Sequence, residues 1–170
     1  MATRTGKIMM RPAKHFVSVA TMLMVGLICL EVPAFAQSDC KQAKGNVVES
    51  EPLTSPVVSG TVSNAGWLDG AAVKVFSAFG SPTPSATAFT GFARFTITTS
   101  RGQLAGSAII LYDTATGQGT NLLYIDPNAS TGRFAGATGT LFENVTQSTV
   151  TSTTLTVQIE LSGQVCLAGQ

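Results

Sequence analysis

The sequence has little of the side-chain chemistry on which most enzymes depend. Its 170 residues include one histidine and three cysteines, and charged residues make up only 11% of the chain. The histidine, His15, and all five methionines lie within the first 36 residues, which have the features of a signal peptide. A chain that loses this segment has no imidazole, so the usual histidine-assisted nucleophilic triads are excluded.

Basic residues are also too few to form a polyanion-binding surface. After residue 36 the chain has six basic residues against eight acidic residues. No run of lysine or arginine stands out among them, so little counterion-release energy is available for binding a phosphate backbone. We therefore expect no nucleic-acid partner.

Residues 1–36 predict a signal peptide that directs export. Basic residues precede an apolar run over residues 16–30, and small residues occupy the positions that signal peptidase inspects before Gln37. We expect cleavage before Gln37 and no stable membrane anchor afterwards. A retained anchor is the alternative, but Glu31 ends an apolar run that is already shorter than the about 20 residues needed to span a bilayer.

Two cysteines remain after this segment: Cys40, a few residues beyond the predicted cleavage site, and Cys166, near the end of the chain. In an oxidising compartment we expect them to form one disulfide that closes nearly the whole chain into a loop. A metal site is the weaker alternative, because no histidine or further thiol completes a tetrahedral ligand set. We expect no metal and no cofactor.

From residue 57 onward, short alternating runs rich in β-branched residues are separated by glycine-bearing turns, which is typical of an all-β sandwich or barrel. Residues 37–56 are polar with two prolines, and we interpret them as an N-terminal tether with little strand. The β-barrel domain is then expected over residues 57–170. The predicted strands are 57–63, 72–79, 89–99, 104–112, 121–125, 139–145, 154–161 and 164–167.

About eight strands with mostly short connections favour an up-and-down antiparallel order. Eight such strands avoid exposed edges most completely by closing on themselves, and a barrel of that size is filled by side chains or holds one small ligand. We therefore predict a closed antiparallel barrel, with a two-sheet sandwich as the alternative. In the strand over 72–79, Lys74 and Phe76 share one face while Val73 and Val75 share the other.

Residues 130–142 are rich in glycine and alanine around one large apolar ring, that of Phe134. We interpret this segment as a tight chain reversal with the ring inserted into the core, and we expect Arg133 to hold the turn by donating to backbone carbonyls. The residues predicted to define this structural motif are Gly132, Arg133, Phe134, Gly136 and Gly139.

Four short motifs carry a family resemblance: Gly66-Trp67, residues 95–99 with Gly102 and Leu104, residues 131–139, and residues 163–166. In this order they resemble bacterial exported proteins with an allene oxide cyclase-like barrel, which is related in fold to plant dirigent proteins. The resemblance implies a closed antiparallel barrel, an apolar cavity and a secreted or periplasmic location in a bacterium. It transfers no activity, since one fold hosts many functions.

The chain departs from this family at residues 126–130, where related sequences usually carry a glycine pair. We expect Asn128 to make the turn there by adopting the left-handed conformation.

Carboxylates, tyrosines and arginine are the groups that remain for proton transfer. The candidate catalytic residues are Arg94, Tyr112, Asp113, Tyr124 and Glu143. Each has a structural alternative: the tyrosines as rim residues with their hydroxyls in water, Asp113 as a turn former, and Arg94 and Glu143 as solvated charges on the outer face. The candidate ligand-binding residues are Trp67, Tyr112 and Tyr124, with Trp67 either lining a pocket or capping the barrel mouth.

Two classes of function remain open. The first is a non-catalytic exported barrel, structural or binding a small apolar molecule in its interior. The second is an isomerase or cyclase of the allene oxide cyclase or dirigent type, acting on an unsaturated lipid-like or polyketide-like substrate. An enzyme should show an open cavity into which at least two of the five candidates point, whereas a lumen packed with apolar side chains would leave only a structural role. Surface attachment through the threonine-rich residues 146–156 is a third hypothesis, based on composition alone.

Overall fold

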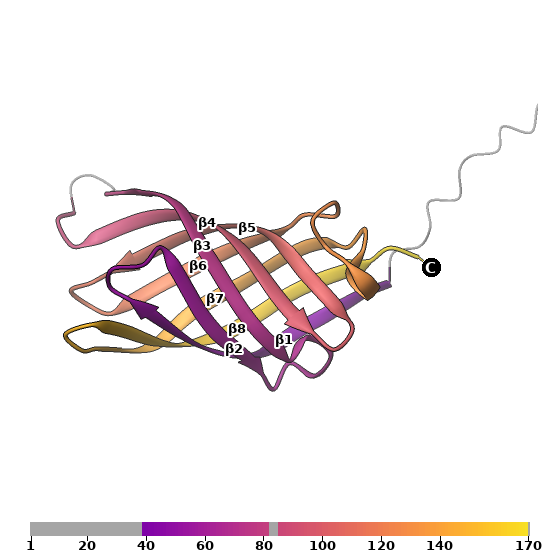
Figure 1. Ribbon diagram of the computed structural model, residues 1–170, viewed down its shortest axis with the longest axis horizontal. Helices are drawn as coiled ribbons and strands as arrows, with labels where there is room; N and C mark the ends of the chain where they lie inside the picture. Colours follow the sequence, from indigo (N-terminus) through magenta and orange to yellow (C-terminus); the bar gives the residue numbers. More distant parts are fainter. Residues whose placement is uncertain (1–38, 82–84, 170) are drawn as a thin grey trace, which may run out of the picture. The chain divides into compact units, whose positions relative to one another are not determined.

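The computed structural model describes residues 39–81 and 85–169, which form a closed antiparallel barrel of eight strands (Figure 1). The strands are β1 (Asp39–Pro52), β2 (Val57–Ser63), β3 (Gly70–Gly80), β4 (Ala88–Thr99), β5 (Gly102–Asp113), β6 (Gln118–Ile125), β7 (Thr138–Val150) and β8 (Thr154–Leu167). Each strand pairs with its neighbours in the sequence, and β1 pairs with β8. The predicted closed barrel is therefore confirmed, while the predicted signal peptide lies outside the described residues.

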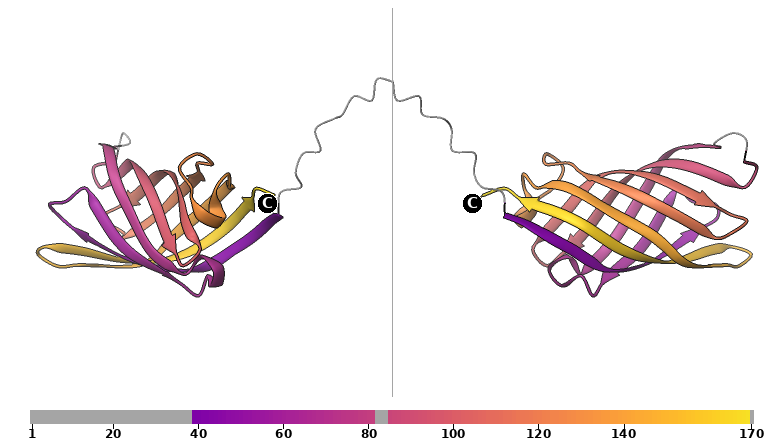
Figure 2. Two further views of the ribbon diagram at one scale, coloured as in Figure 1. Left: turned by 45° about the vertical axis from the view of Figure 1, so that its right-hand side comes forward. Right: turned by 180° about the vertical axis from the view of Figure 1, so that it is seen from behind.

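The first strand corrects two of the predictions. Residues 39–52, assigned to a tether, form β1, which pairs with β8 along its whole length (Figure 2). Their polar composition reflects a strand with one face exposed to solvent. Ala43, Val47 and Glu49 are buried, while most residues between them are exposed. The barrel therefore begins at residue 39 rather than 57, and the segment predicted as a separate eighth strand, 164–167, is the end of β8.

The predicted disulfide joins the two strands that close the barrel. Cys40 and Cys166 are directly opposite each other in the register of β1 and β8, and a disulfide links them across 126 residues of sequence. The bond is compatible with an oxidising compartment. It therefore covalently fixes the pairing of the first strand with the last.

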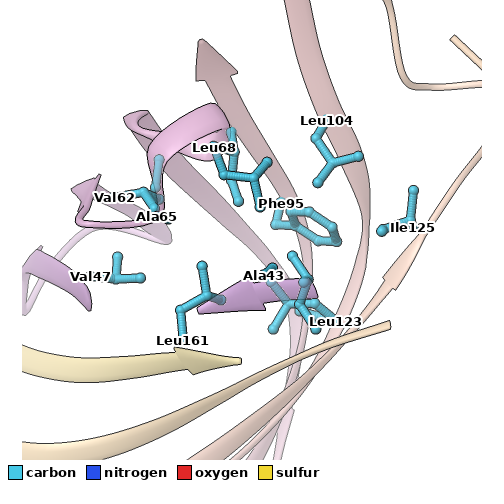
Figure 3. Close-up of a cluster of buried hydrophobic side chains, with 14 of the residues drawn as sticks. Ala43, Val47, Val62, Ala65, Leu68, Phe95, Leu104, Leu123, Ile125 and Leu161 are labelled. Atoms are coloured by element: carbon cyan, nitrogen blue, oxygen red, sulfur yellow. The ribbon is translucent and has the colours of Figure 1, made fainter. Parts of the chain in front are cut away.

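Side-chain alternation decides what fills the barrel. In β8, Val157, Ile159 and Leu161 are buried, whereas Gln158 and Glu160 between them are exposed. Figure 3 shows how such inward-facing side chains from β1, β2, β4, β5, β6 and β8 converge with Leu68 into one apolar cluster. The residues labelled in Figure 3 lie in one half of the barrel, and the same cluster continues toward the other end through Ile110, Tyr112 and Val157.

Two 3-10 turns close that half of the barrel: η1 (Gly66–Leu68), between β2 and β3, and η2 (Gly132–Phe134), between β6 and β7. The Phe134 side chain is 1% exposed, and its ring centroid lies 6.0 Å from that of Trp67. The predicted insertion of this ring into the core is confirmed. Trp67, which is partly buried against the core, caps this end.

The backbone of η2 lies directly against the β4–β5 hairpin. The amide of Thr131 donates to the carbonyl of Gln103 at 2.8 Å, and the amide of Arg133 donates to the carbonyl of Arg101 at 2.9 Å. Gly132 has φ of 60°, and a Cβ atom there would lie 2.6 Å from the Arg101 carbonyl oxygen. Only glycine meets both conditions without displacing the hairpin.

Two expectations about this segment are wrong. Asn128 is not left-handed, because Asn64 is the one non-glycine residue with positive φ in the described part of the chain. Asp126 makes the turn instead, since its Oδ1 atom accepts a hydrogen bond from the Asn128 amide at 2.9 Å. The Arg133 side chain is exposed and, among residues 39–81 and 85–169, donates no hydrogen bond to a carbonyl, so main-chain bonds hold the turn.

We predict that replacing both Cys40 and Cys166 with serine lowers the free energy of unfolding by about 4–5 kcal/mol, because the disulfide restricts nearly the whole unfolded chain. Urea denaturation of the oxidised wild type and the double variant measures this difference. A double variant as stable as the wild type, or an unreduced intact mass showing two free thiols, would contradict the role given to the disulfide.

Candidate functional site

The other half of the barrel contains buried charge instead of a purely apolar core. Glu49 from β1, Lys74 from β3, Asn121 from β6 and Glu143 from β7 all project into the lumen and are 2–6% exposed. We call these four residues the lumen cluster. Asn121 and Glu143 are opposite each other on the paired strands β6 and β7, whereas Lys74 contacts Glu49 and Glu143 from strands with which β3 is not paired, so the closed barrel completes the cluster.

Lys74 is the centre of the lumen cluster. Its Nζ atom donates a hydrogen bond to Glu49 Oε1 at 2.5 Å and another to Glu143 Oε2. The Asn121 amide donates to the same oxygen of Glu143 at 2.7 Å. Within the described residues, every fully buried side-chain nitrogen or oxygen has a hydrogen-bond partner. The cluster is therefore a fully satisfied polar network, which fixes the position of each of its groups.

Burial and charge act in opposite directions on these groups. Burial raises the pKa of the Glu49 carboxyl, and the Glu143 carboxylate adds to the rise, against the opposing effect of Lys74. Burial alone would lower the pKa of Lys74, but the attraction of Glu143 and Glu49 outweighs it, so the pKa of Lys74 is raised. Lys74 thus stays charged. In the ion pair between Glu49 and Lys74, it is the ionised form of Glu49 that burial destabilises.

A cavity of about 40 Å³ lies above the lumen cluster and leads to the mouth of the barrel, the end opposite η1 and η2. Glu49, Lys74 and Asn121 form the polar part of its lining. The rest is apolar apart from Glu51, with the aromatic residues Phe76, Phe89 and Tyr112 and the aliphatic residues Val58, Ile110, Val145, Leu155, Val157 and Ile159.

Aromatic rings pack against one another around part of this cavity. The centroid of Phe89 lies 5.6 Å from that of Tyr112, and the exposed Phe79 lies 4.7 Å from Phe76 and 6.1 Å from Phe89. Contacts of this kind stabilise the ring positions beyond simple burial. The wall of the cavity is therefore preformed on the side of β3, β4 and β5.

Two of the five predicted catalytic residues face the interior. Tyr112 is 7% exposed and lines the cavity. Glu143 is 2% exposed and lies in the lumen cluster, bonded to Lys74 and Asn121, so the alternative of a solvated outer-face charge is wrong for this residue.

The other three predicted residues lie elsewhere. Arg94 and Tyr124 are exposed on the outer wall of the barrel, on β4 and β6. Asp113 ends β5, where its Oδ1 atom accepts a hydrogen bond from the Ala115 amide at 2.9 Å, and this bond lowers the pKa of the carboxyl. It is thus the turn former that was its structural alternative.

Of the three predicted ligand-binding residues, the structure places only Tyr112 at the cavity. Trp67 caps the opposite end of the barrel, and Tyr124 is 47% exposed on the outer wall. No single site therefore includes all three.

Sequence reasoning missed Glu49, Lys74 and Asn121. One signal was available for Lys74, which alternation placed on the same face as Phe76; that face is the lumen. Glu49 was hidden by the assignment of its segment to a tether. Asn121 begins an inward-facing series with Leu123 and Ile125, and in the predicted barrel this alternation was the available signal that it points into the lumen.

We predict that Lys74→Met lowers the free energy of unfolding by about 3–5 kcal/mol, because it leaves two buried carboxyl groups without their counter-charge. The triple variant Lys74→Met, Glu49→Gln, Glu143→Gln has no buried charge and should recover much of this loss. Urea denaturation of the three proteins makes the comparison. A single variant as stable as the wild type would show that the lumen is hydrated and the pairing unimportant.

The raised pKa of Glu49 predicts a dependence of stability on pH. The native state holds this proton more tightly than the unfolded state, whose carboxyl titrates near the ordinary value of 4.5. The stabilisation from protonated Glu49 is therefore present below that value and is lost as the pH rises through the raised pKa. We expect the melting temperature of the wild type, relative to Glu49→Gln, to fall as the pH increases from about 4 to about 8. A relative rise over this range would mean that Lys74 controls the titration.

In the part of the chain that the structure describes, no helix is long and apolar enough to cross a membrane, and no group of three or more histidine, cysteine, aspartate or glutamate side chains is arranged to hold a metal ion. Comparisons of the chain with protein-family models, with curated proteins and with solved structures give no match. The function is therefore argued from the barrel and its cavity.

Proposed function

We propose that this protein is an exported, non-catalytic barrel that binds a small molecule with an apolar body at the mouth of its lumen. The observation that supports the proposal is the cavity above the lumen cluster, with walls of Phe76, Tyr112 and other apolar residues and a polar floor. Ligand sites are commonly concave and mostly apolar, with a few polar groups that fix orientation. Eight-stranded barrels are wide enough for one such ligand.

The packing of the lumen limits the size of this ligand. The apolar cluster fills the half of the barrel next to η1 and η2, so a ligand enters from the mouth and reaches no deeper than the lumen cluster. At about 40 Å³ the cavity is far smaller than the roughly 300–1,000 Å³ of sites that take up a whole drug-sized ligand. Only one end of the ligand is therefore enclosed, while its body lies against the partly buried Phe76, Phe89 and Leu155.

Export is the second part of the proposal. It rests on the signal-peptide pattern of residues 1–36 and is compatible with the disulfide between Cys40 and Cys166. We place the protein in the periplasm or outside the cell, among bacterial proteins with an allene oxide cyclase-like barrel. The consecutive strand order, closed by β1 and β8, supports this relationship.

The alternative is an isomerase or cyclase acting on an unsaturated lipid-like or polyketide-like molecule. One observation favours it: a carboxyl group with a raised pKa, Glu49, lines an apolar cavity together with Tyr112. Buried acids of this kind are suited to proton transfer and are concentrated at active sites. Against it, Glu143 is engaged by Lys74 and Asn121, and Arg94 and Tyr124 are on the outer wall.

We predict that Leu155→Trp, which adds bulk at the cavity, weakens the binding of 1-octanol at least about tenfold, corresponding to one or two lost apolar contacts. The matched control is Leu111→Trp, at an exposed position on the outer wall of β5. Titrations followed by NMR chemical shifts measure both affinities. Equal binding by both variants and the wild type, or no binding to the wild type, would contradict the proposed site.

A second experiment distinguishes a binding protein from an enzyme by analysing the molecule that the protein binds. Native mass spectrometry of protein purified from its own host identifies a co-purifying ligand, which is then returned to ligand-free protein. Recovery of the unchanged molecule supports a binding protein. Conversion to an isomer that Glu49→Gln abolishes would establish the enzyme instead.

A further inference from the structure

We propose that the mouth cavity selects organic cations, specifically primary ammonium ions with an apolar body, over neutral and anionic molecules of the same shape. The inference rests on the proposed function, because it names the ligand class of the same cavity. It follows from the distribution of charge, from the aromatic lining and from the size of the enclosed space.

The cavity and its floor carry an excess of acidic groups. Glu49 and Glu51 line the cavity and Glu143 lies beneath it, whereas Lys74 is the one basic residue among the cavity-lining residues. Lys74 is already bonded to Glu49 and Glu143. A ligand carboxylate would therefore add a further acidic group to a site that already disfavours ionised Glu49 and Glu51, whereas an ammonium ion would stabilise their ionised forms.

Glu51 is the carboxyl group left for a ligand. It is half-buried in the cavity wall, and within the described residues its side chain forms no hydrogen bond or ion pair. Burial raises the pKa of the Glu51 carboxyl, because Lys74, which acts in the opposite direction, supplies too little counter-charge to offset the desolvation. A bound cation would supply that charge, so its binding should release protons from the site.

Among the described residues, the connections at the mouth carry no positive charge. Residues 53–56, 85–87, 114–117 and 151–153 contain no lysine or arginine. Besides Glu51, the strand ends at the mouth carry a second acid, Asp113, on β5. An approaching cation thus meets attraction from the rim to the floor.

The aromatic lining fits the same ligand class. Phe76, Phe89 and Tyr112 present rings to the cavity, and the faces of such rings attract cations as well as apolar groups. The cavity is small, about 40 Å³, which favours a compact head group such as –NH3+ over a bulky trimethylammonium group. The geometry therefore favours a primary amine in its protonated form.

Three ligands with one chain length and different head groups test this inference. Isothermal titration of the exported, disulfide-intact protein near neutral pH with octylammonium, 1-octanol and octanoate compares their affinities. We expect octylammonium to bind at least about tenfold more tightly than 1-octanol, and octanoate to bind most weakly.

A matched pair of variants assigns the preference to the cavity. Glu51→Gln should weaken octylammonium about tenfold and leave 1-octanol unchanged, because it removes the charge and keeps the shape. Glu160→Gln, on the outer wall of β8, should change neither affinity. Both positions are partly or fully exposed, so both variants should fold.

The outcomes separate this inference from the proposal on which it depends. Tight binding of 1-octanol without a preference for octylammonium would overturn the cation inference and leave the proposed binding function intact. A preference for octanoate, or one for octylammonium that Glu51→Gln does not reduce, would also overturn it. Failure of all three ligands to bind would contradict the proposed function itself.

Discussion

The pairing of β1 with β8 is the constraint on which the rest of the structure depends. It extends along all of β1, from Asp39 opposite Leu167 to Pro52 opposite Thr154, and it turns a sheet into a barrel with an inside and an outside. Without it, Glu49 would be a surface acid on an exposed edge, and Lys74 and Glu143 would lose their common neighbour. The disulfide between Cys40 and Cys166 fixes one end of the same pairing.

The closed lumen is divided into two halves with different physical character. The half next to η1 and η2 is packed with apolar side chains, sealed by Phe134 and Trp67, and supplies the hydrophobic stabilisation. The half next to the mouth contains the lumen cluster, whose desolvation offsets much of the attraction between its charges. Apolar residues of similar volume would serve stability there equally well. The charges are consistent with the ligand site that we propose in the cavity above them.

Local patterns predicted much of this fold. Alternation in β8 and the small residues around Phe134 were sufficient to identify the strand and the plug, because both depend on neighbours in the sequence. The strand β1 was missed because its sequence contains lysine and glutamate and one of its faces is exposed to solvent. Such a sequence resembles a polar tether until its partner strand is known. The lumen cluster was predicted only in part: Glu143 was a candidate, but its ion pair with Lys74 joins two strands that are not paired with each other and meet only inside the closed barrel.

Buried charge lies in the lumen beneath the mouth cavity, and the side-chain ammonium group of Lys74 reports on it most directly. NMR spectroscopy of this group with 15N-labelled lysine measures its exchange with water and its proximity to neighbouring side chains. The account predicts a Lys74 Nζ resonance that remains visible at neutral pH, with cross-relaxation to the side-chain amide of Asn121. A signal broadened by exchange as for surface lysines, without contact to Asn121, would show that Lys74 is solvated and that the charged floor does not exist.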